Sequence, residues 1–288
     1  MRAAVLGSPV AHSLSPVLHA AAYAALGLRG WTYERVECDA AALPGWIAAR
    51  DATWAGVSVT MPGKRAALQV ATTVSVRARV VGAANTLVRG DDGAWSADCT
   101  DVDGVAGALR AAGVHTPTTV AADLDDAVVL GGGGTACAVV RALYDLGLSS
   151  VTVVVRDPAR AVDVLAVADR VGLRARATTF DALGGVPSAR TTALVNTTPG
   201  GAVDGWAERL VAGLPSSATV LDAVYHPWPT PLVAAAGARG LRVATGLDML
   251  LHQAFGQVEQ FTGRPAPRAA MHAALAGATG CPVHPTTS

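Results

Sequence analysis

Lys64 is the only lysine in a sequence whose other 21 cationic residues are arginine. A lysine ammonium can release a proton when its surroundings lower its pKa, whereas an arginine guanidinium effectively cannot. The single lysine is therefore consistent with a role in proton transfer. A solvated surface lysine accounts for the same count equally well, so composition alone leaves both interpretations open.

Four short polar clusters have the side chains to bind a small hydroxylated acid. They are residues 12–16 (His-Ser-Leu-Ser-Pro), 56–64 (Gly-Val-Ser-Val-Thr-Met-Pro-Gly-Lys), 82–86 (Gly-Ala-Ala-Asn-Thr) and 99–101 (Cys-Thr-Asp). Each cluster falls where a strand is expected to end or a helix to begin, and α/β proteins collect ligands at such places. Small hydroxyl and amide groups suit a polyhydroxylated acid, whereas a phosphate site would use more cations.

A glycine-rich turn further along the chain has the spacing of a dinucleotide-binding motif. Gly131, Gly133 and Ala136 satisfy the pattern G-x-G-x-x-[G/A]. A predicted strand at residues 127–130 precedes the turn and a predicted helix at 135–146 follows it, which is the context that the motif requires. Such a turn lets the backbone approach a pyrophosphate and offers it the N–H groups of a helix N-terminus.

The residue that follows the next predicted strand, 151–155, bears on the choice of cofactor. An acidic residue at this point would hold a ribose 2′-hydroxyl, whereas an arginine accommodates a 2′-phosphate. Arg156 stands there, with Arg160 one turn further, and the pair favours NADP. Two solvated arginines are the alternative. Asp157 could contact the ribose of NAD, but it also suits the N-cap of a helix that begins at Pro158.

Short strands separated by helices must position these residues, and this pattern predicts an α/β fold with a mainly parallel sheet. The predicted strands are residues 3–6, 31–37, 56–60, 85–89, 95–98, 127–130, 151–155, 193–196, 219–225 and 242–245. Helices are expected from Ser15, as N-cap, to Leu26, over 40–49, over 135–146, from 158 onward, and over 247–261, where apolar residues recur at helical spacing. A hairpin around Asp92-Gly93 joins the strands at 85–89 and 95–98.

Composition excludes several classes of protein. The chain has 288 residues, enough for two medium domains, and its 22 basic and 22 acidic residues cancel. No broad attraction to nucleic acid or to an anionic membrane is expected, and no apolar run reaches the roughly 18 residues of a spanning helix. Four scattered cysteines and seven histidines form no metal motif, which favours a reduced, cytoplasmic protein that needs no metal. The sequence defines no oligomeric state, and a homodimer is compatible with it.

Taken in chain order, these motifs resemble those of the shikimate dehydrogenase family. The matching segments are residues 7–16, 59–64, 82–86, 100–104, 131–136, 196–199, 222–232 and 246–254. The resemblance covers nearly the whole chain and implies reversible, NADP-dependent reduction of 3-dehydroshikimate to shikimate, in the route to aromatic amino acids. It also implies two domains. Residues 1–101, completed by C-terminal helices in 247–288, would form the substrate domain, and residues 102–246 a Rossmann-like NADP domain.

The resemblance also implies a role for individual residues. Lys64 and Asp101 match the catalytic pair of the family. The positions that match substrate contacts, or lie near the substrate, are Ser13, Ser15, Ser58, Thr60, Lys64, Asn85, Asp101, Tyr225 and Gln253. The positions that match cofactor contacts are Gly131, Gly133, Gly134, Thr135, Arg156, Thr198 and Gly246. Within the first set, Ser13 and Ser15 match serines that bind the substrate carboxylate.

The chain departs from the family pattern at four positions. Ser58 and Cys99 stand where the family usually has asparagine, as does Val155, and Asp157 replaces a usual threonine. We expect these changes to affect affinity and cofactor preference more than the reaction, and we expect Cys99 to have no catalytic role.

The implied reaction needs an acid near the substrate. Hydride that arrives at a ketone carbon creates alkoxide character, which a nearby acid should protonate. Lys64 can donate that proton and recover it in the reverse direction. Asp101 can orient the ammonium and hold a substrate hydroxyl, and the sequence does not decide which of the two carries the proton.

Three other functions remain to be distinguished. A quinate/shikimate dehydrogenase of broader range, using NAD, would have the same fold. A methylenetetrahydrofolate dehydrogenase would carry Tyr-x-x-x-Lys, but Thr60 stands four residues before Lys64. A non-catalytic nucleotide-binding protein would have no reason to keep Lys64 together with Asp101.

Overall fold

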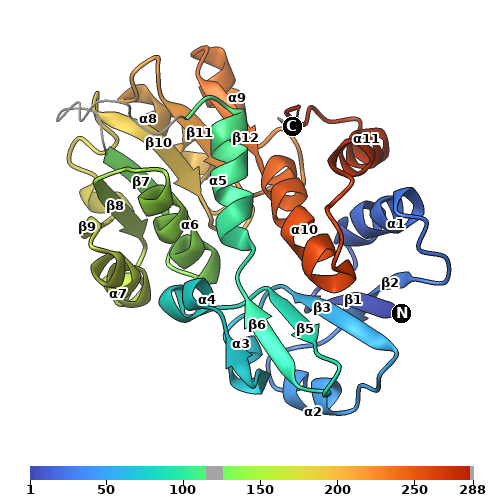
Figure 1. The fold of residues 1–288 in the computed structure, drawn as a ribbon. Coiled ribbons are helices and arrows are strands. Elements are labelled where there is room, and N and C mark those ends of the chain that lie inside the picture. The colour runs from blue at the N-terminus through green and yellow to red at the C-terminus, as the bar shows by residue number, and fades with distance from the viewer. Residues whose placement is uncertain (115–125, 286–288) are drawn as a thin grey trace. The chain divides into compact units, whose positions relative to one another are not determined.

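The computed structural model describes residues 1–114 and 126–285, and the chain divides into two compact units (Figure 1). Unit 1 consists of Met1–Gly104 and Leu250–Ser288, and unit 2 of Val105–Met249. Both boundaries fall inside helices, α5 (Asp101–Ala111) and α10 (Gly246–Thr262). Each unit contains a sheet flanked by helices, which confirms the α/β prediction.

Unit 1 is built on a six-stranded mixed sheet with the strand order β2-β1-β3-β5-β6-β4. Its strands are β1 (Arg2–Gly7), β2 (Thr32–Glu37), β3 (Trp54–Val59), β4 (Thr73–Val74), β5 (Thr86–Arg89) and β6 (Trp95–Asp98). β1 pairs in parallel with β2 and β3, whereas β5 is antiparallel to both β3 and β6. The expectation of a mainly parallel sheet is confirmed for this half, because among these six strands only β5 runs against the others, where the predicted hairpin joins it to β6.

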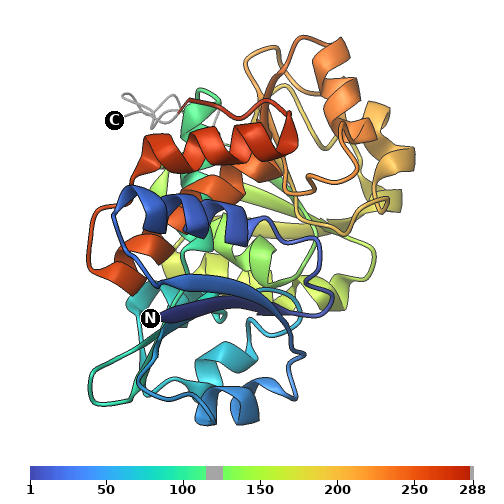
Figure 2. The same ribbon diagram turned by 90° about the vertical axis from the view of Figure 1, so that its right-hand side faces the viewer.

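The helices of unit 1 cover this sheet. They are α1 (Ser15–Ala25), α2 (Leu43–Ala48), α3 (Ala66–Val70), α4 (Val76–Val81), most of α10, and α11 (Arg268–Thr279). α11 packs alongside α1, as Figure 2 shows. The family resemblance implied C-terminal helices within residues 247–288, but no residue pattern located α11. Only Met271 and Leu275 of this alanine-rich helix are buried, so its apolar stripe is too sparse to recognise.

Unit 2 is built on a six-stranded parallel sheet with the strand order β12-β11-β10-β7-β8-β9. Its strands are β7 (Asp126–Leu130), β8 (Ser150–Val155), β9 (Arg174–Thr179), β10 (Thr191–Asn196), β11 (Thr219–Asp222) and β12 (Arg242–Thr245). The first strand of the unit lies in the centre, and the chain crosses from β9 to β10 on its other side. This is the doubly wound order of a Rossmann fold, in which ligands bind at the carboxyl ends of the two central strands, β7 and β10.

The helices of unit 2 pack in pairs, α6 (Gly134–Asp145) against α7 (Val162–Val171) and α8 (Ala207–Ala212) against α9 (Pro231–Ala238). Helices on both faces of the sheet explain why β7, β8 and β10 are almost entirely buried. β9 is an exposed edge strand with alternating Arg and Ala, so it gave no apolar signal and was not predicted.

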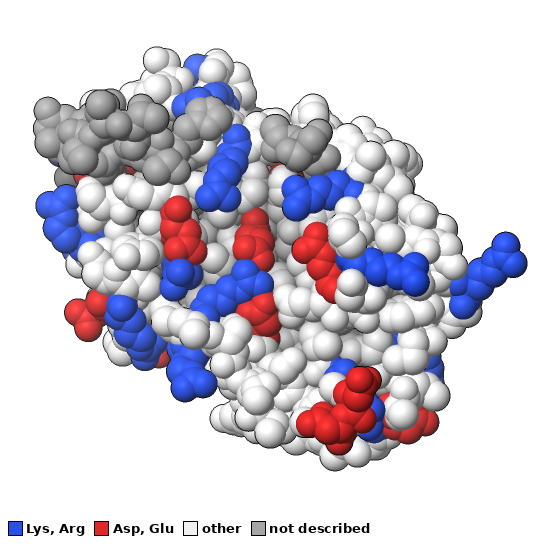
Figure 3. All heavy atoms as spheres, viewed as in Figure 1, with Lys and Arg blue, Asp and Glu red and all other residues white. Residues whose placement is uncertain are grey.

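Charge on the surface is mixed in sign. On the face shown in Figure 3, acidic and basic side chains are interspersed, in keeping with a formal net charge of zero. Such a surface creates no broad field that would attract a polyanion. In the part of the chain that the structure describes, no helix combines the length and apolar composition needed to cross a membrane.

Candidate active site

Lys64 and Asp101 form an ion pair in unit 1. Lys64 Nζ contacts Asp101 Oδ2, and the two side chains are only 17% and 7% exposed. Lys64 lies in the loop after β3, and Asp101 is the first residue of α5, directly beyond β6. Partial burial strengthens the attraction between the carboxylate and the ammonium, and the carboxylate lies at the N-terminal end of α5. The predicted pair is therefore assembled by two segments that lie far apart in the sequence.

Asn85 holds the second oxygen of Asp101. Its buried amide nitrogen donates to Asp101 Oδ1 at 2.9 Å and to Gln253 Oε1 at 3.1 Å. Its amide oxygen accepts from the Thr100 backbone nitrogen at 2.7 Å and from Thr86 Oγ1 at 3.0 Å. Because every polar atom of this side chain is engaged, Asn85 is more than a turn residue. It fixes the plane of the Asp101 carboxylate.

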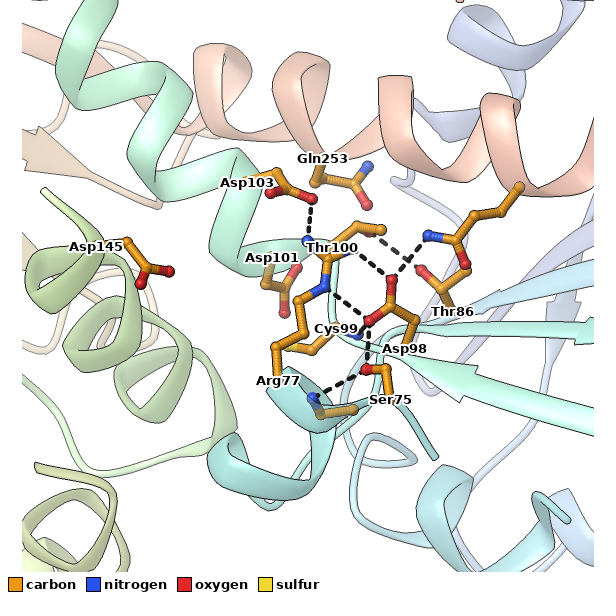
Figure 4. A network of polar contacts seen from close by, with 12 residues as sticks. Ser75, Arg77, Thr86, Asp98, Cys99, Thr100, Asp101, Asp103, Asp145 and Gln253 are labelled. Atoms are coloured by element: carbon orange, nitrogen blue, oxygen red, sulfur yellow. Dashed lines mark hydrogen bonds and ion pairs between the residues drawn. The ribbon is translucent and has the colours of Figure 1, made fainter. Parts of the chain in front are cut away.

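Gln253 completes this group from α10. Its amide nitrogen donates to the Leu250 carbonyl at 2.9 Å, which leaves Oε1 for Asn85. Figure 4 shows Gln253 above Asp101 at the start of α5. The structure thus brings together Lys64, Asn85, Asp101 and Gln253, which sequence reasoning had assigned from four separate motifs.

The serines of the predicted substrate site lie on β3, at Ser58, and at the start of α1, at Ser13 and Ser15. Leu14, not Ser15, is the N-cap of α1; Ser15 is the first helical residue, and its backbone nitrogen donates to Ser13 Oγ at 3.3 Å. The N-cap prediction for Ser15 was therefore wrong, because the turn at residues 10–13 brings Ser13 to that end of the helix. Thr60 follows β3 and packs on Gly7, where a Cβ would lie 2.2 Å from Thr60 Cγ2.

Tyr33 is a member of this serine group that the sequence analysis missed. Its hydroxyl donates to Ser58 Oγ at 2.7 Å and also interacts with the Ser15 side chain. Burial raises the pKa of Tyr33 above its ordinary value, so the hydroxyl stays protonated. The alternation of residues 31–37 was the available signal, since it placed Tyr33 on one face of a strand.

A second polar network surrounds Asp98 at the end of β6 (Figure 4). Arg77 Nε donates to Asp98 Oδ1 at 2.7 Å, Ser75 Oγ donates to the same oxygen at 2.6 Å, and Gln260 Nε2 donates to Oδ2 at 2.8 Å. Burial opposes ionisation of Asp98, but these hydrogen bonds and the charge of Arg77 lower its pKa to about 2. Arg77 also reaches Asp103 Oδ2 at 2.5 Å. The sequence analysis missed this network.

Cys99 has no reactive character in this setting. It is buried, and its backbone nitrogen donates to Asp98 Oδ1 at 2.8 Å. Burial and the nearby Asp101 charge raise the pKa of its thiol, which keeps it protonated. Among residues 1–114 and 126–285, no three His, Cys, Asp or Glu side chains gather as a metal site.

The glycine-rich turn of unit 2 has the geometry of a pyrophosphate site. Gly131 follows β7 with a φ of +110°, and a Cβ there would lie 2.6 Å from Thr197 Oγ1. Gly133 is the N-cap of α6 and has open space where a Cβ would point. Gly134 and Thr135 open the helix, whose N-terminus no side chain caps. A dinucleotide pyrophosphate therefore fits here, because no side chain caps the N–H groups of the helix and a ligand can approach the backbone at Gly133.

The segment that follows β8 packs against this turn. A Cβ on Gly132 would lie 2.1 Å from the Arg160 carbonyl oxygen. Asp157 caps the short 3₁₀ helix Pro158–Ala161 by accepting from the Ala159 backbone nitrogen at 2.9 Å, which confirms it as an N-cap. Arg156 and Arg160 are exposed.

Buried hydrogen bonds anchor the loops beyond β10 and β11. Asn196 Nδ2 donates to Asp222 Oδ1 at 2.9 Å, and Asn196 Oδ1 accepts from the Thr198 hydroxyl at 2.7 Å. Burial raises the pKa of Asp222 above its usual value. Gly246 allows a close approach, because a Cβ there would lie 2.3 Å from the Ala223 carbonyl oxygen and 3.2 Å from Tyr225 Cδ1. Thr198, Tyr225 and Gly246 all belong to unit 2.

Two glycines of the turn should respond differently to alanine. Gly132→Ala forces a methyl group into the Arg160 carbonyl, so we expect a loss of about 1–3 kcal/mol in unfolding free energy. Gly133→Ala has space for its methyl, so stability should be kept and only dinucleotide binding weakened. Urea unfolding without cofactor, together with calorimetric titration of NADP, separates the effects. Equal stability of the two variants would contradict the packing argument.

Comparisons with known proteins agree with this geometry. The shikimate dehydrogenase substrate binding domain model matches residues 5–87, and the shikimate 5′-dehydrogenase C-terminal domain model matches residues 246–276. A shikimate dehydrogenase (NADP(+)) of Methylobacterium radiotolerans is 42% identical over 278 residues, covering 93% of each chain.

Solved structures show the same similarity. Shikimate dehydrogenase of Mycobacterium tuberculosis is 52% identical with a TM-score of 0.86, covering 96% of this chain and 99% of that one. The Thermus thermophilus enzyme in complex with NADP(H) and shikimate is 36% identical with a TM-score of 0.80, over 96% of this chain and 99% of that one. With its site residues assembled as described, the chain belongs to the shikimate dehydrogenase family.

Proposed function

We propose that this protein is an NADP-dependent shikimate dehydrogenase that reversibly reduces 3-dehydroshikimate to shikimate, a step in aromatic amino acid biosynthesis. The observation that carries the proposal is the Lys64–Asp101 pair, held by Asn85 among side chains that donate and accept hydrogen bonds. In this proposal unit 1 binds the substrate and unit 2 binds NADP.

Lys64 and Asp101 perform the acid–base work of the proposed reaction. Bound NADPH would supply the hydride for reduction, and NADP⁺ would accept it in the reverse direction. The Lys64 ammonium protonates the substrate oxygen as negative charge develops on it, and recovers the proton during oxidation. Asp101 orients the ammonium through Oδ2, and Asn85 keeps the carboxylate in place through Oδ1.

The remaining polar residues bind the substrate in this proposal. Ser13 and Ser15 bind its carboxylate, and Tyr225 is a further proposed substrate contact. The ring hydroxyls are bound by Ser58, Thr60, Asn85, Asp101 and Gln253. Polar side chains with committed partners, such as Asn85, orient a hydroxylated ring better than flexible surface groups do, because they lose less entropy on binding.

Cofactor binding is proposed for the carboxyl end of the parallel sheet. Gly131, Gly133, Gly134 and Thr135 bind the pyrophosphate, and Thr198 and Gly246 lie along the rest of the dinucleotide. Arg156 binds the 2′-phosphate. Support comes from the open space at Gly133 and from the capping role of Asp157, which leaves Arg156 as the group suited to a 2′-phosphate.

Arg156→Ala should lower NADP affinity. Loss of a charge-assisted contact with the 2′-phosphate should cost about 1.5–3 kcal/mol of NADP binding and leave NAD binding unchanged. Calorimetric titration with both dinucleotides measures this, with Arg170→Ala, an exposed arginine of the same unit, as control. If the unmutated protein prefers NAD, the assignment is wrong and Asp157 contacts the ribose.

An absorbance assay tests the function as a whole. Shikimate oxidation is followed with NADP and, in parallel, with NAD, and quinate replaces shikimate in a second pair of reactions. The proposal requires the highest kcat/KM with shikimate and NADP. Comparable quinate turnover with NAD would favour the enzyme of broader range. Tight NADPH binding without any turnover would favour a nucleotide-binding protein.

The proposal extends to the setting in which the protein works. Its small-molecule partner would be shikimate or 3-dehydroshikimate, without nucleic acid or membrane partners, in a reducing cytoplasm. The scattered cysteines and zero net charge support this setting. We propose a homodimer, to be checked by light scattering of the purified protein.

A further inference from the structure

Gln257 lies one helical turn beyond Gln253 on α10 and is 1% exposed. Its amide oxygen accepts from Ser58 Oγ at 2.8 Å and from His19 Nε2 at 3.4 Å. Its amide nitrogen donates to the Asn85 carbonyl oxygen and to Thr86 Oγ1, both at 3.3 Å. Both hydrogens and both lone pairs of the amide are therefore used inside the protein.

The neutral ring of His19 is one of the partners that orient the Gln257 amide. Burial lowers the pKa of His19 to about 3, so the ring is neutral at physiological pH. Because the oxygen of Gln257 can only accept, Nε2 of His19 carries the hydrogen, and Nδ1 accepts from the Tyr23 hydroxyl at 3.3 Å. His19 also stacks on Tyr33 with ring centroids 3.9 Å apart. The group that holds Gln257 is rigid and uncharged.

The hydroxyl hydrogen bonds next to Gln257 run in one direction, from Tyr33 through Ser58 to the amide oxygen of Gln257. Ser58 gives its hydrogen to Gln257 and accepts the hydrogen of the Tyr33 hydroxyl. The Tyr33 oxygen is then left to interact with Ser15. On the other side of the amide, Thr86 donates to Asn85 Oδ1 at 3.0 Å. Gln257 thus stands between the serine group and the group around Asp101.

We propose that Gln257 is a positioning residue of the substrate site, an inference that rests on the proposed function. It holds Asn85 before β5 and Ser58 on β3 at a fixed separation, and Tyr33 links Ser58 to Ser15, so that the hydroxyl and carboxylate contacts of one substrate molecule are made together. Ser58, in place of the asparagine usual in the family, lacks an amide of its own. Gln257 supplies that amide from α10.

A purely packing role would not need this residue. Burying an amide costs free energy that its hydrogen bonds must offset, and an apolar side chain of similar volume would fill the same space without that cost. A fully satisfied buried amide instead selects one geometry among several that an apolar contact would allow. The benefit therefore lies in geometry.

Gln257→Met tests the proposal by keeping the volume and removing all four hydrogen bonds. We expect kcat/KM for shikimate to fall about tenfold or more, mainly through KM, while KM for NADP stays within about twofold. Gln69→Met, at an exposed position of the same unit, is the matched control and should behave as wild type. A melting curve of each variant records stability separately.

The second test moves the amide from position 257 on α10 to position 58 on β3. Gln257→Ser should lose activity as Gln257→Met does, and Ser58→Asn added to Gln257→Ser should recover part of it, because the amide then comes from β3. Recovery supports positioning whether or not Gln257→Met folds. The proposal is overturned if Gln257→Met keeps wild-type kcat/KM with only a lower melting temperature, or if the swap recovers nothing. Absence of wild-type shikimate turnover would instead overturn the proposed function.

Discussion

Lys64→Arg is expected to lower kcat by about 10²–10⁴-fold, nearly as far as Lys64→Ala, because general acid–base groups contribute on that scale. Arginine keeps the positive charge beside Asp101 but cannot release a proton near neutral pH. If Lys64 only attracted or oriented the substrate, the arginine variant would retain much of its activity. The comparison therefore separates proton transfer from electrostatic attraction.

The measurement is kcat at saturating shikimate and NADP, with folding checked by circular dichroism. Arg65→Lys, a charge-conserving change at the adjacent exposed residue, is the control. NADPH affinity should not change in Lys64→Arg, since Lys64 belongs to unit 1 and the glycine-rich turn to unit 2. A folded Lys64→Arg enzyme within a few-fold of wild type would leave Asp101, or a bound water, as the acid.

Asp101→Asn provides an internal test of the same pair. The amide cannot hold the ammonium as a carboxylate does, so kcat should fall. If Lys64 and Asp101 act as a unit, the double variant Lys64→Ala/Asp101→Asn should be little worse than the poorer single variant. Multiplicative losses would mean that the two residues act independently.

The catalytic pair could be predicted because its chemistry is visible in the sequence. Lys64 is unique, and Lys64, Asn85 and Asp101 all lie in motifs at expected strand ends or helix starts. The hydrogen bonds that join them depend on where β3, β5 and α5 lie in space, which residue spacing does not specify. The structure adds that Asn85 accounts for the second oxygen of Asp101.

The residues that support this pair could not be predicted in the same way. Arg77 and Gln260 are common residue types at unremarkable spacing, and each gains significance only through its contact with Asp98. Gln257 likewise depends on the packing of α10 over the sheet, where a Cβ on Gly56 would lie 2.4 Å from Phe261. Tertiary contact, absent from any local pattern, defines these positions.

Secondary structure, too, could be predicted only where a local sequence pattern determines it. Strands buried on both faces, such as β8, were recognised from continuous β-branched residues. The helix expected at residues 40–49 begins only at Leu43, because Asp39 Oδ1 accepts from the backbone nitrogens of Ala41 and Ala42 in a turn. The strand expected to reach Tyr225 ends at Asp222, whose side chain accepts from the Val224 backbone nitrogen at 3.0 Å. Side-chain bonds to the backbone ended both elements early.

Arg77→Met is expected to destabilise the protein by about 3 kcal/mol at pH 7, because it leaves the Asp98 carboxylate without its cation. The side chains of Asp98 and Arg77 are 15% and 27% exposed. The expected loss of stability therefore lies at the lower end of the range for the removal of one partner from a buried ion pair. Ser75, Gln260 and the Cys99 backbone nitrogen would still donate to Asp98. Hydrogen bonds alone do not replace the positive charge.

The effect of Arg77→Met should depend on pH in a defined direction. The pKa of Asp98 is lowered to about 2 in the native protein, below its ordinary value of 3.8. Its ionised form therefore stabilises the fold above about pH 4, and this contribution disappears as the pH falls towards 2. The difference in unfolding free energy between wild type and Arg77→Met should be largest at neutral pH and shrink between about pH 4 and pH 2.

Urea unfolding over this pH range measures the difference, with Arg79→Met, an exposed neighbour on α4, as control. A difference that stays constant down to pH 2 would show that Arg77 stabilises the fold by packing, and that Asp98 does not depend on its charge.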